Sequence, residues 1–297
     1  MTTPEFTNNR ENFCYRHPDR QSFVLCQRCL RTICPECQTP APVGVICPEC
    51  MNAERKNRPP AQKKAARRWR GGGAATMGAV RSGKPVVTYA LLAVTSFIGL
   101  VQLIPGLNAP IIQALGFYAP FLYPNLSLLP FEPWRLLTAL FVHGGFVHLA
   151  LNMLALWMLG QNLEPMLGRV RYLALYLISG LGGSVMVAVL APETWTVGAS
   201  GAIFGLLASL LIIGRHIGAN VTGILVILGI NFAFGFFAGG ISWQAHLGGA
   251  ITGALVALIY VRTKRRDQRT WQIVSLAALV VLLIVVVAVV PPLILLA

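Results

Sequence analysis

A serine, two histidines and an asparagine are the residues of this sequence whose types and positions could do hydrolytic chemistry. Ser200 lies in a Gly-Ala-Ser-Gly run at 198–201 that opens an apolar segment. His246 opens a later apolar segment, and His148 and Asn152 open an earlier one. A histidine base can activate a serine hydroxyl as a nucleophile, and further donors can stabilise the oxyanion that forms. The four residues are therefore candidates for the nucleophile, base and oxyanion site of a serine hydrolase.

Each of these residues also has a structural interpretation. A serine among small residues commonly serves helix packing, and His246 alone could be a buried histidine whose hydrogen bonds are satisfied within a helix bundle. His148 and Asn152 lie one helical turn apart on one face and could join helices by hydrogen bonds. Chemistry is favoured because all four occur together with glycine pairs that let the helices carrying Ser200 and His246 approach closely. These pairs are Gly201-x3-Gly205 and Gly249-x3-Gly253.

Seven cysteines and a histidine near the N-terminus form a second candidate site. They occur as four pairs at two-residue spacing, and a loop of that length lets both members of a pair reach one metal ion. Eight soft ligands fill two tetrahedral sites, whereas disulfides would leave one cysteine unpaired and would not explain the histidine. The sequence therefore predicts two structural Zn²⁺ ions. The eight ligands are Cys14, His17, Cys26, Cys29, Cys34, Cys37, Cys47 and Cys50.

This cysteine-rich segment resembles a B-box-type zinc finger in its Cys-x2-His start and in the Cys-x2-Cys pairs that follow. It departs from that pattern at Cys47 and Cys50, which stand where histidines are usual, so sequential and interleaved pairing of the ligands both stay open. We expect a structural module with a docking face for a cytoplasmic protein. Binding to nucleic acid is not expected, because no recognition helix can be identified in the segment.

The composition of the 297 residues indicates a polytopic membrane protein rather than a soluble one. Hydrophobic residues make up 55% of the chain, charged residues 11%, and the mean hydropathy is +0.65. Of the 24 basic residues, 15 lie in residues 1–84 and five more in 262–269. The chain is thus divided into a polar head, a membrane body and a basic loop before its last apolar segment.

Seven apolar segments are expected to enter or cross the membrane as helices. The second and the fourth are short for a full span. Between the first and the second, a stretch with several prolines is too apolar for an ordinary loop and too broken for one helix, so we expect it to lie partly embedded beside the bundle. The seven segments are 86–104, 147–162, 172–190, 200–214, 221–237, 244–261 and 272–290.

These features predict four regions. Residues 1–50 form a zinc-binding domain, 51–84 a basic flexible linker, 85–262 a core of six transmembrane helices, and 263–297 a basic cytoplasmic loop with a seventh transmembrane helix. The linker is polar and basic, so it cannot bury a core and could touch anionic membrane lipids. The N-terminus has no apolar region typical of a cleavable signal peptide, so the first membrane segment is expected to direct insertion.

The distribution of basic residues among the short connections predicts the orientation. With the N-terminus in the cytoplasm, the outside connections hold only Arg135, and the other basic residues of the connections lie inside. We therefore expect a multi-pass cell-membrane protein with its N-terminus inside, its C-terminus outside and its cysteines in a reducing compartment. The segments that begin near His148, Ser200 and His246 then run in one direction, so these residues share a level toward the outer membrane face.

Four motifs within residues 86–262 together resemble the rhomboid family of intramembrane serine proteases. They are Trp134-Arg135, His143-x4-His148-x3-Asn152, Gly198-Ala199-Ser200-Gly201 and Ala245-His246-x2-Gly249-x3-Gly253. The resemblance implies that Ser200 is the nucleophile and His246 the general base of a dyad. It also implies an oxyanion site formed by the backbone N–H of Ser200 and the side chains of His148 and Asn152.

No carboxylate is expected near this dyad. Between residues 85 and 261 the carboxylates are Glu132, Glu164 and Glu193, each expected in a connection between helices. Another group must therefore orient His246, and Phe204, one turn after Ser200 on the same face, could stack on its ring. Many relatives carry tyrosine at this position, so the contribution of a phenol hydroxyl is missing here.

The resemblance implies a serine endopeptidase that cleaves transmembrane segments of membrane proteins near the outer face of a bacterial membrane, with no cofactor needed for catalysis. Segment 221–237 and the loop 238–242 could form a gate for an unwound substrate, or the loop could be an ordinary turn.

A catalytically silent rhomboid-like protein that binds membrane clients is the alternative function, but it should lack Ser200 or His246. A transporter would usually show internal repeats, which this sequence does not.

Overall fold

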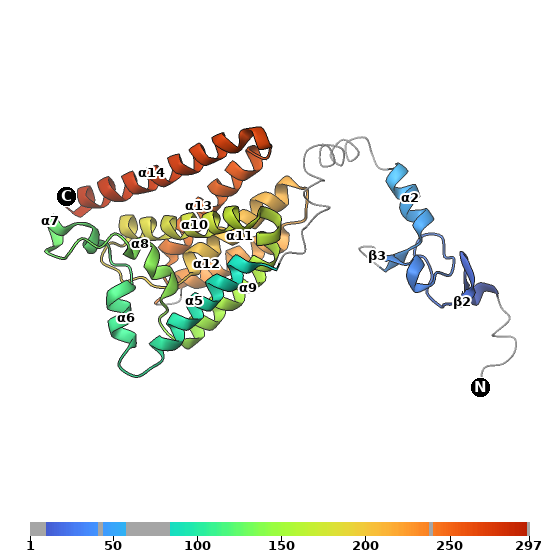
Figure 1. Cartoon of the computed structure of the whole chain (residues 1–297), viewed down its shortest axis with the longest axis horizontal. Coiled ribbons are helices and arrows are strands. Elements are labelled where there is room, and N and C mark those ends of the chain that lie inside the picture. Colours follow the sequence, from blue (N-terminus) through green and yellow to red (C-terminus); the bar gives the residue numbers. More distant parts are fainter. Residues whose placement is uncertain (1–9, 41–43, 58–83, 238–239, 296–297) are drawn as a thin grey trace. The chain divides into compact units, whose positions relative to one another are not determined.

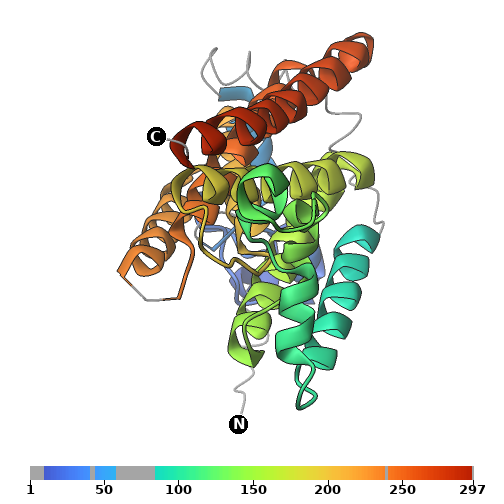
Figure 2. The ribbon, with the colours of Figure 1, turned by 90° about the vertical axis from the view of Figure 1, so that its left-hand side faces the viewer.

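The computed structural model consists of two units, each with its own core (Figure 1, Figure 2). The smaller unit lies within Met1–Ala74 and the larger within Ala75–Ala297. The structure describes residues 10–40, 44–57, 84–237 and 240–295.

The described part of the smaller unit contains two short antiparallel strand pairs and one α-helix around a core of cysteines. Strand β1 (Phe13–Cys14) pairs antiparallel with β2 (His17–Gln21), and β3 (Thr39–Pro40) pairs antiparallel with β4 (Val45–Ile46). Two 3-10 helices, η1 (Arg10–Asn12) and η2 (Pro35–Cys37), complete the connections. The buried cluster is Cys14, Cys26, Ile33, Cys34, Cys37, Ile46 and Cys47. The strands are short and the core is small, and domains of this size usually need disulfides or metal ions for stability.

The helix α2 (Pro48–Asn57) ends the described part of the smaller unit. It begins one residue after β4 and continues through residues 51–57, which were predicted to belong to the linker. Residues 58–83 of the predicted linker lie outside the described residues.

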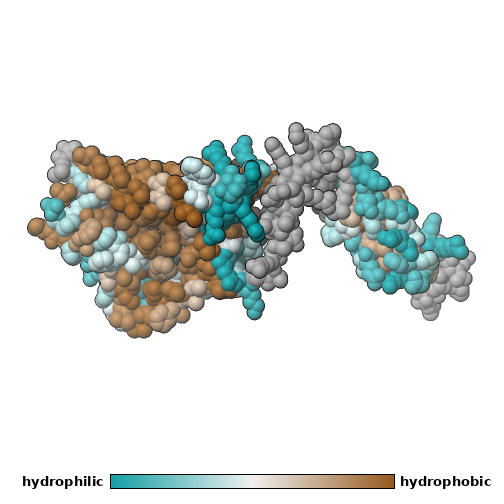
Figure 3. All heavy atoms as spheres, turned by 45° about the horizontal axis from the view of Figure 1, so that its top comes forward, coloured by the Kyte–Doolittle hydropathy of each residue, from teal (hydrophilic) through white to brown (hydrophobic). Residues whose placement is uncertain are grey.

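The larger unit is helical, as predicted for an all-α membrane protein, and apolar residues cover much of the surface seen in Figure 3. Within the described residues, seven apolar helices correspond to the seven predicted segments. Four are long and apolar enough to cross a membrane, and the other three, which include the fourth segment, are shorter. The seven are α5 (Val86–Gln102), α9 (Phe146–Leu167), α10 (Arg169–Leu190), α11 (Ser200–His216), α12 (Thr222–Phe237), α13 (Trp243–Arg262) and α14 (Arg269–Leu295), with η5 (Arg266–Gln268) before α14.

Helix α9 is longer than predicted, because a polar residue near its end is buried rather than exposed. The Glu164 carboxylate accepts hydrogen bonds from the N–H groups of Val87 at 3.0 Å and Thr88 at 2.8 Å. It therefore caps the start of α5, where backbone N–H groups have no helical acceptor. The helix ends only at Gly168, which has a φ of +82°. The expectations that the second segment is short and that Glu164 lies in a connection are wrong for this reason.

Helices α11 and α13 pack so closely that their backbones touch. A Cβ atom added to Gly249 would overlap the carbonyl oxygen of Gly201, and one added to Gly253 would overlap the backbone of Gly205. Helix α10 packs against both of them. The close approach predicted from the two glycine pairs is confirmed, and it brings together the helices that begin near Ser200 and near His246.

The stretch between α5 and α9 is broken into short pieces, as predicted, and Arg135 organises it. The guanidinium of Arg135, 3% exposed, pairs with Glu132, donates to the carbonyl of Gly116 at 2.8 Å and lies 3.9 Å from the centroid of the Phe121 ring. A buried charge needs such partners, because an unpaired one is costly. The pieces are α6 (Asn108–Leu115), η3 (Ala119–Leu122), α7 (Pro124–Ser127), α8 (Arg135–Thr138) and η4 (Ala139–Phe141).

Candidate functional site

Ser200 is the first residue of α11, and the chain enters this helix through Gly198. Gly198 has a φ of +120°, which favours glycine, and its N–H donates to the carbonyl of Ala139 at 2.9 Å. The side chain of Ser200 is half-buried. Because the first N–H groups of a helix have no acceptor within it, the N–H of Ser200 is available to an outside acceptor. This position thus combines a hydroxyl group with a backbone donor.

His246 lies in the first turn of α13 and is 6% exposed. Ser242 caps this helix by accepting a hydrogen bond from the N–H of Ala245 at 3.3 Å. The imidazole stacks on the ring of Phe204, with centroids 4.0 Å apart and an interplanar angle of 9°. The predicted stacking is confirmed, and it fixes the plane of the imidazole without a carboxylate.

The starts of α11 and α13 are in contact beside Ser200 and His246. A Cβ atom added to Gly201 would lie 3.2 Å from the carbonyl oxygen of Ala245, so the neighbours of the two side chains touch. Within the described residues no hydrogen bond joins Ser200 to His246, and the buried Nδ1 of His246 has no partner. Such bonds are often long without substrate, so the contact between the helix starts is the informative geometry.

His148 lies in the first turn of α9, against the entry to α11. Its Nδ1 accepts a hydrogen bond from the N–H of Gly144 at 3.4 Å, so the neutral ring carries its proton on Nε2. That edge of the ring faces Gly198, where an added Cβ atom would lie 2.8 Å from Nε2 and 2.7 Å from Cε1. The Nε2–H of His148 is therefore directed toward the segment that leads into Ser200.

Asn152 is buried one turn further along α9. Its Nδ2 donates to the carbonyl of His148 at 2.9 Å, which holds the amide against the helix. An amide nitrogen carries two N–H groups, so the second one remains for another acceptor. The structure thus places two side-chain donors, from His148 and Asn152, at the same end of α9.

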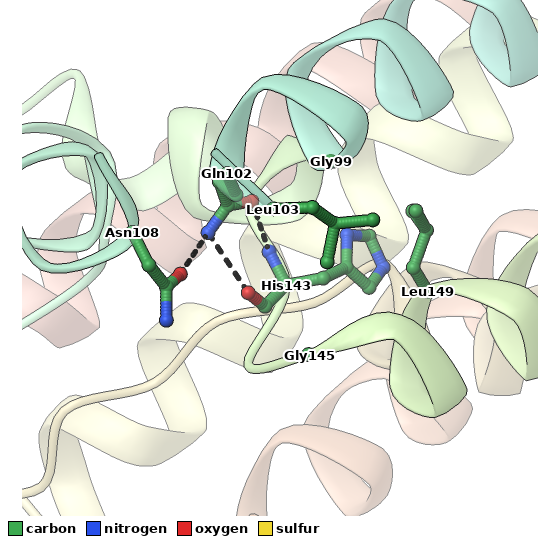
Figure 4. A pocket seen from close by; sticks show the side chains of 7 residues that line it. All are labelled: Gly99, Gln102, Leu103, Asn108, His143, Gly145 and Leu149. Atoms are coloured by element: carbon green, nitrogen blue, oxygen red, sulfur yellow. Dashed lines mark hydrogen bonds between the residues drawn. The ribbon is translucent and has the colours of Figure 1, made fainter. Parts of the chain in front are cut away.

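Gln102, at the end of α5, is a residue of this region that the sequence interpretation missed. Its side chain donates to the carbonyl of His143 at 2.9 Å and to Asn108 at 3.0 Å, and accepts from the N–H of His143 at 3.0 Å (Figure 4). The His143 ring meets that of His148 at a centroid distance of 5.0 Å. Gln102 therefore holds the turn before α9. In the sequence it could have been noticed as the one amide side chain near the end of an apolar segment.

A small cavity adjoins the ring of His143 (Figure 4). Its volume is about 40 Å³, which is enough for one water molecule. Both ring nitrogens of His143 are buried without a hydrogen-bond partner among the described residues. A water molecule in this cavity would have a polar partner in that ring. The lining residues are Gly99, Gln102, Leu103, Asn108, His143, Gly145 and Leu149.

The predicted gate falls partly outside the described residues, which omit 238–239. The described end of α12 carries Phe236 and Phe237, and both side chains are exposed. Gly235 lies close to the catalytic candidate on α13, because a Cβ atom added to it would be 3.0 Å from Nδ1 of His246. Helix α12 therefore reaches the imidazole, and its function as a gate stays a prediction.

The eight predicted metal ligands form two clusters in the smaller unit, and their pairing is interleaved. The first pair along the chain meets the third, and the second meets the fourth, with the ligand atoms of each cluster within 4.8 Å of one another. The first cluster brings the β1–β2 hairpin next to η2. The second brings the loop after β2 next to the start of α2. The clusters are Cys14, His17, Cys34 and Cys37, and Cys26, Cys29, Cys47 and Cys50.

The chemistry of these clusters fits zinc. Nδ1 of His17 lies 3.3 Å from the sulfur of Cys34 and 3.5 Å from that of Cys37, and the cysteines are free rather than joined in disulfides. Burial raises the pKa of Cys14, but backbone hydrogen bonds, chiefly from Cys34 and Arg16, outweigh it and lower the pKa to about 6. In the same cluster, burial and the neighbouring thiols raise the pKa of Cys37 to about 11, so a bound cation is needed to keep all three thiols ionised together. Three thiolates with one imidazole, or four thiolates, are ligand sets that tetrahedral Zn²⁺ takes.

Comparison with known proteins gives consistent matches to one family. The model of the Rhomboid domain matches residues 130–263. The chain is 37% identical over 185 residues to the rhomboid protease GluP of Bacillus subtilis (strain 168), over 60% of this chain and 35% of GluP. It is 40% identical over 135 residues to RHOMBOID-like protein 4 of Arabidopsis thaliana, over 43% of this chain and 34% of that protein. It is 35% identical over 148 residues to the "Putative rhomboid protease YdcA" of Bacillus subtilis (strain 168), over 48% of this chain and 74% of YdcA.

The chain spans about a third of the length of GluP and of RHOMBOID-like protein 4, and nearly three quarters of YdcA. The residues that match the domain model include the starts of α9, α11 and α13, and with them His148, Asn152, Ser200 and His246. The apolar helices make this a membrane protein. The chain belongs to the rhomboid family.

Proposed function

We propose that this chain is an intramembrane serine endopeptidase in which Ser200 is the nucleophile and His246 the general base. The observation that carries the proposal is the contact between the helix starts that bear them, with the His246 ring held on Phe204. A serine hydroxyl is a weak nucleophile until a base takes its proton, so a base at this place is the chemical requirement. The names of GluP and YdcA as proteases support the same activity.

The oxyanion site consists, in this proposal, of the N–H of Ser200 and the side chains of His148 and Asn152. When the hydroxyl attacks a carbonyl carbon, negative charge develops on the carbonyl oxygen, and donors already in place stabilise it. The direction of the His148 Nε2–H and the second N–H of Asn152 support these roles. His246 then passes the proton to the leaving amine.

A dyad without a carboxylate is supported by the contacts of the acidic residues. Glu132 pairs with Arg135, Glu164 caps α5, and Glu193 is exposed. In this proposal the His246 ring is oriented by stacking on Phe204 instead of by a carboxylate.

The substrates are proposed to be transmembrane segments of other membrane proteins, cut near the outer membrane face. The carbonyls of an intact helix are engaged in hydrogen bonds, so a substrate must unwind to be cut. We propose that it enters laterally through a gate formed by α12 and the loop 238–242. The basic connections support an orientation with the N-terminus in the cytoplasm and the C-terminus outside. The membrane of this proposal is that of a bacterial cell, whose lipids surround the bundle. A silent client-binding rhomboid protein is the alternative, and the presence of Ser200 and His246 favours the protease.

The remaining regions have proposed functions of their own. Residues 1–50 bind two structural Zn²⁺ ions and dock a cytoplasmic protein, and we expect no nucleic acid partner. Residues 51–84 connect this domain to the catalytic core at 85–262, and 263–297 add the basic loop and the seventh helix. The two ligand clusters support the number of ions, and catalysis itself needs no cofactor.

The test is cleavage of a single-span reporter by purified protein in detergent. Ser200→Ala and His246→Ala should each abolish cleavage without unfolding the bundle. Ser209→Ala is the matched control, because Ser209 lies on the same helix and its hydroxyl donates to the carbonyl of Leu206, away from the site. Cleavage by Ser200→Ala at the unmodified rate would remove Ser200 from the mechanism.

A second variant tests the oxyanion donors. Removing one donor of this kind typically lowers kcat by about 10²–10³. We expect a loss of this size for Asn152→Ala, smaller than for Ser200→Ala, because His148 and the Ser200 N–H remain. A poorly folded Asn152→Ala variant as inactive as Ser200→Ala would show that the amide is structural.

A further inference from the structure

Helix α14 contains a carbonyl group that its own helix cannot satisfy. In an α-helix the carbonyl of residue i accepts from the N–H of residue i+4, and proline has no N–H. Pro291 lies inside α14, so the carbonyl of Val287 has no helical donor. Val287 is 6% exposed, and a buried carbonyl without a donor is costly, most of all where lipid replaces water. A donor from outside the helix is therefore required.

Tyr123 supplies that donor from the stretch between α5 and α9. It is 8% exposed, and its hydroxyl donates to the carbonyl of Val287 at 2.5 Å. Both residues belong to one buried cluster that also contains Phe117 and Ala245. Two segments 164 residues apart in the sequence are thus joined by a hydrogen bond to the carbonyl that Pro291 leaves without an i+4 donor.

The remainder of α14 is attached only along a narrow face. The helix runs along the outside of the bundle (Figure 1, Figure 2). Most of its described side chains are exposed. Near its beginning, Gln272 accepts from Nε of Arg171 at 2.8 Å and donates to the hydroxyl of Thr263 at 2.7 Å. Near its end, the carbonyl of Val287 accepts the hydrogen bond from Tyr123. Helix α14 is therefore anchored at both ends, and the second anchor lies on a loop.

The loop that holds Tyr123 is itself bonded to the segment that enters α11. Phe117 and Thr196 exchange backbone hydrogen bonds, at 2.9 and 2.8 Å. Their neighbours Tyr118 and Trp195 stack, with centroids 5.0 Å apart and an interplanar angle of 7°. The stretch that carries Tyr123 is therefore in direct contact with the segment that leads into α11.

We propose that Tyr123 and Pro291 make the seventh helix a positioning element of the site. The helix holds the loop through the Tyr123 hydroxyl, and the loop holds the entry to α11, so that the N–H of Ser200 stays where an oxyanion forms. The effect on turnover rests on the proposed endopeptidase function, whereas the effect on the loop does not.

Tyr123→Phe removes the hydroxyl and leaves the carbonyl of Val287 unpaired. We expect a lower Tm, about fivefold faster amide exchange at Phe117 and Thr196, and a kcat lower by about fivefold with KM little changed. Hydrogen exchange read by mass spectrometry and reporter cleavage measure the two effects separately. Tyr89→Phe is the matched control, because Tyr89 is exposed on α5, and it should change none of these quantities.

Pro291→Ala separates stability from positioning. Added to Tyr123→Phe, it supplies the missing N–H, so the carbonyl of Val287 is satisfied inside the helix. We expect Tm to recover while amide exchange in the loop stays fast and kcat stays low. Pro292→Ala supplies an N–H to Ala288 instead, so in the same background it should not restore Tm.

Two results would overturn the proposal. If Tyr123→Phe leaves amide exchange in the loop unchanged, the hydroxyl does not hold the loop. If the double variant with Pro291→Ala recovers both slow exchange and kcat, the hydroxyl only satisfies a carbonyl. A complete lack of cleavage by the unmodified protein would contradict the proposed function instead, and the exchange measurement would still test the contact.

Discussion

The interiors of the two units of this chain contain opposite kinds of contact. In the smaller unit the buried side chains are mostly cysteines, gathered in two clusters. In the larger unit the tightest contacts occur where side chains are absent, as between Gly201 and Gly249. A unit as small as the first cannot bury enough apolar surface in water and needs cross-links. Helices in lipid gain little from apolar burial, so they depend on close packing.

Removing the metal should have the largest effect, and it should affect only the smaller unit. Structural Zn²⁺ contributes about 10–16 kcal/mol in zinc-finger peptides, which is comparable with the whole stability of a small domain. We expect a chelator to unfold residues 10–57 while the bundle stays folded. Metal analysis should find two zinc ions per chain before chelation, and amide exchange should then report on each unit. Full protection of the smaller unit after complete loss of metal would contradict this view.

Adding one methyl group between α11 and α13 should have the next largest effect. A Cβ atom at Gly249 would overlap the carbonyl oxygen of Gly201, which cannot move without moving the helix. We expect Gly249→Ala to destabilise the bundle by about 3 kcal/mol, the upper end for overpacking. Gly229→Ala is the control, because its Cβ would meet nothing within 4 Å, and it should be neutral or slightly stabilising. Thermal unfolding in detergent compares the two, and equal Tm values would show that the helices can separate without cost.

Loss of the buried cap on α5 should have a smaller effect. Glu164→Gln keeps the shape of the side chain but replaces an acceptor with a donor, so an N–H of Val87 or Thr88 loses its partner. We expect a loss of about 1–3 kcal/mol in unfolding free energy. Glu193→Gln, at an exposed glutamate, should leave Tm unchanged. If both variants unfold at the same temperature as the unmodified protein, the cap contributes little to the bundle.

Much of the site could be predicted because its signals are local. The two-residue spacing of the cysteine pairs indicated two metal sites, and the four-residue spacing of Ser200 and Phe204 indicated a shared face on which the ring of His246 stacks. The glycine pairs indicated which helices touch. Each of these inferences starts from a spacing within one short segment.

The other contacts depend on partners far away in the chain. Gln102 bonds to the backbone of a residue 41 positions later, and Tyr123 to one 164 positions later. Glu164 looked like the end of a helix, because a carboxylate in an apolar sequence usually marks its exit from the membrane, yet backbone N–H groups of α5 make burial possible. The interleaved pairing of the metal ligands likewise follows from how the hairpins fold back, which spacing does not determine.

Removing the smaller unit should have the smallest effect on cleavage. All eight metal ligands lie within residues 1–50, and each unit has its own core. The proposed orientation places the metal clusters in the cytoplasm and the site near the outer membrane face, so the two should not touch. Deleting residues 1–70 should therefore leave cleavage of a generic reporter largely unchanged, while Arg81 and Lys84 remain to hold the orientation, and metal analysis should find no zinc. A truncated protein that is folded but inactive would mean that the smaller unit acts on the larger one, and that the two are not independent.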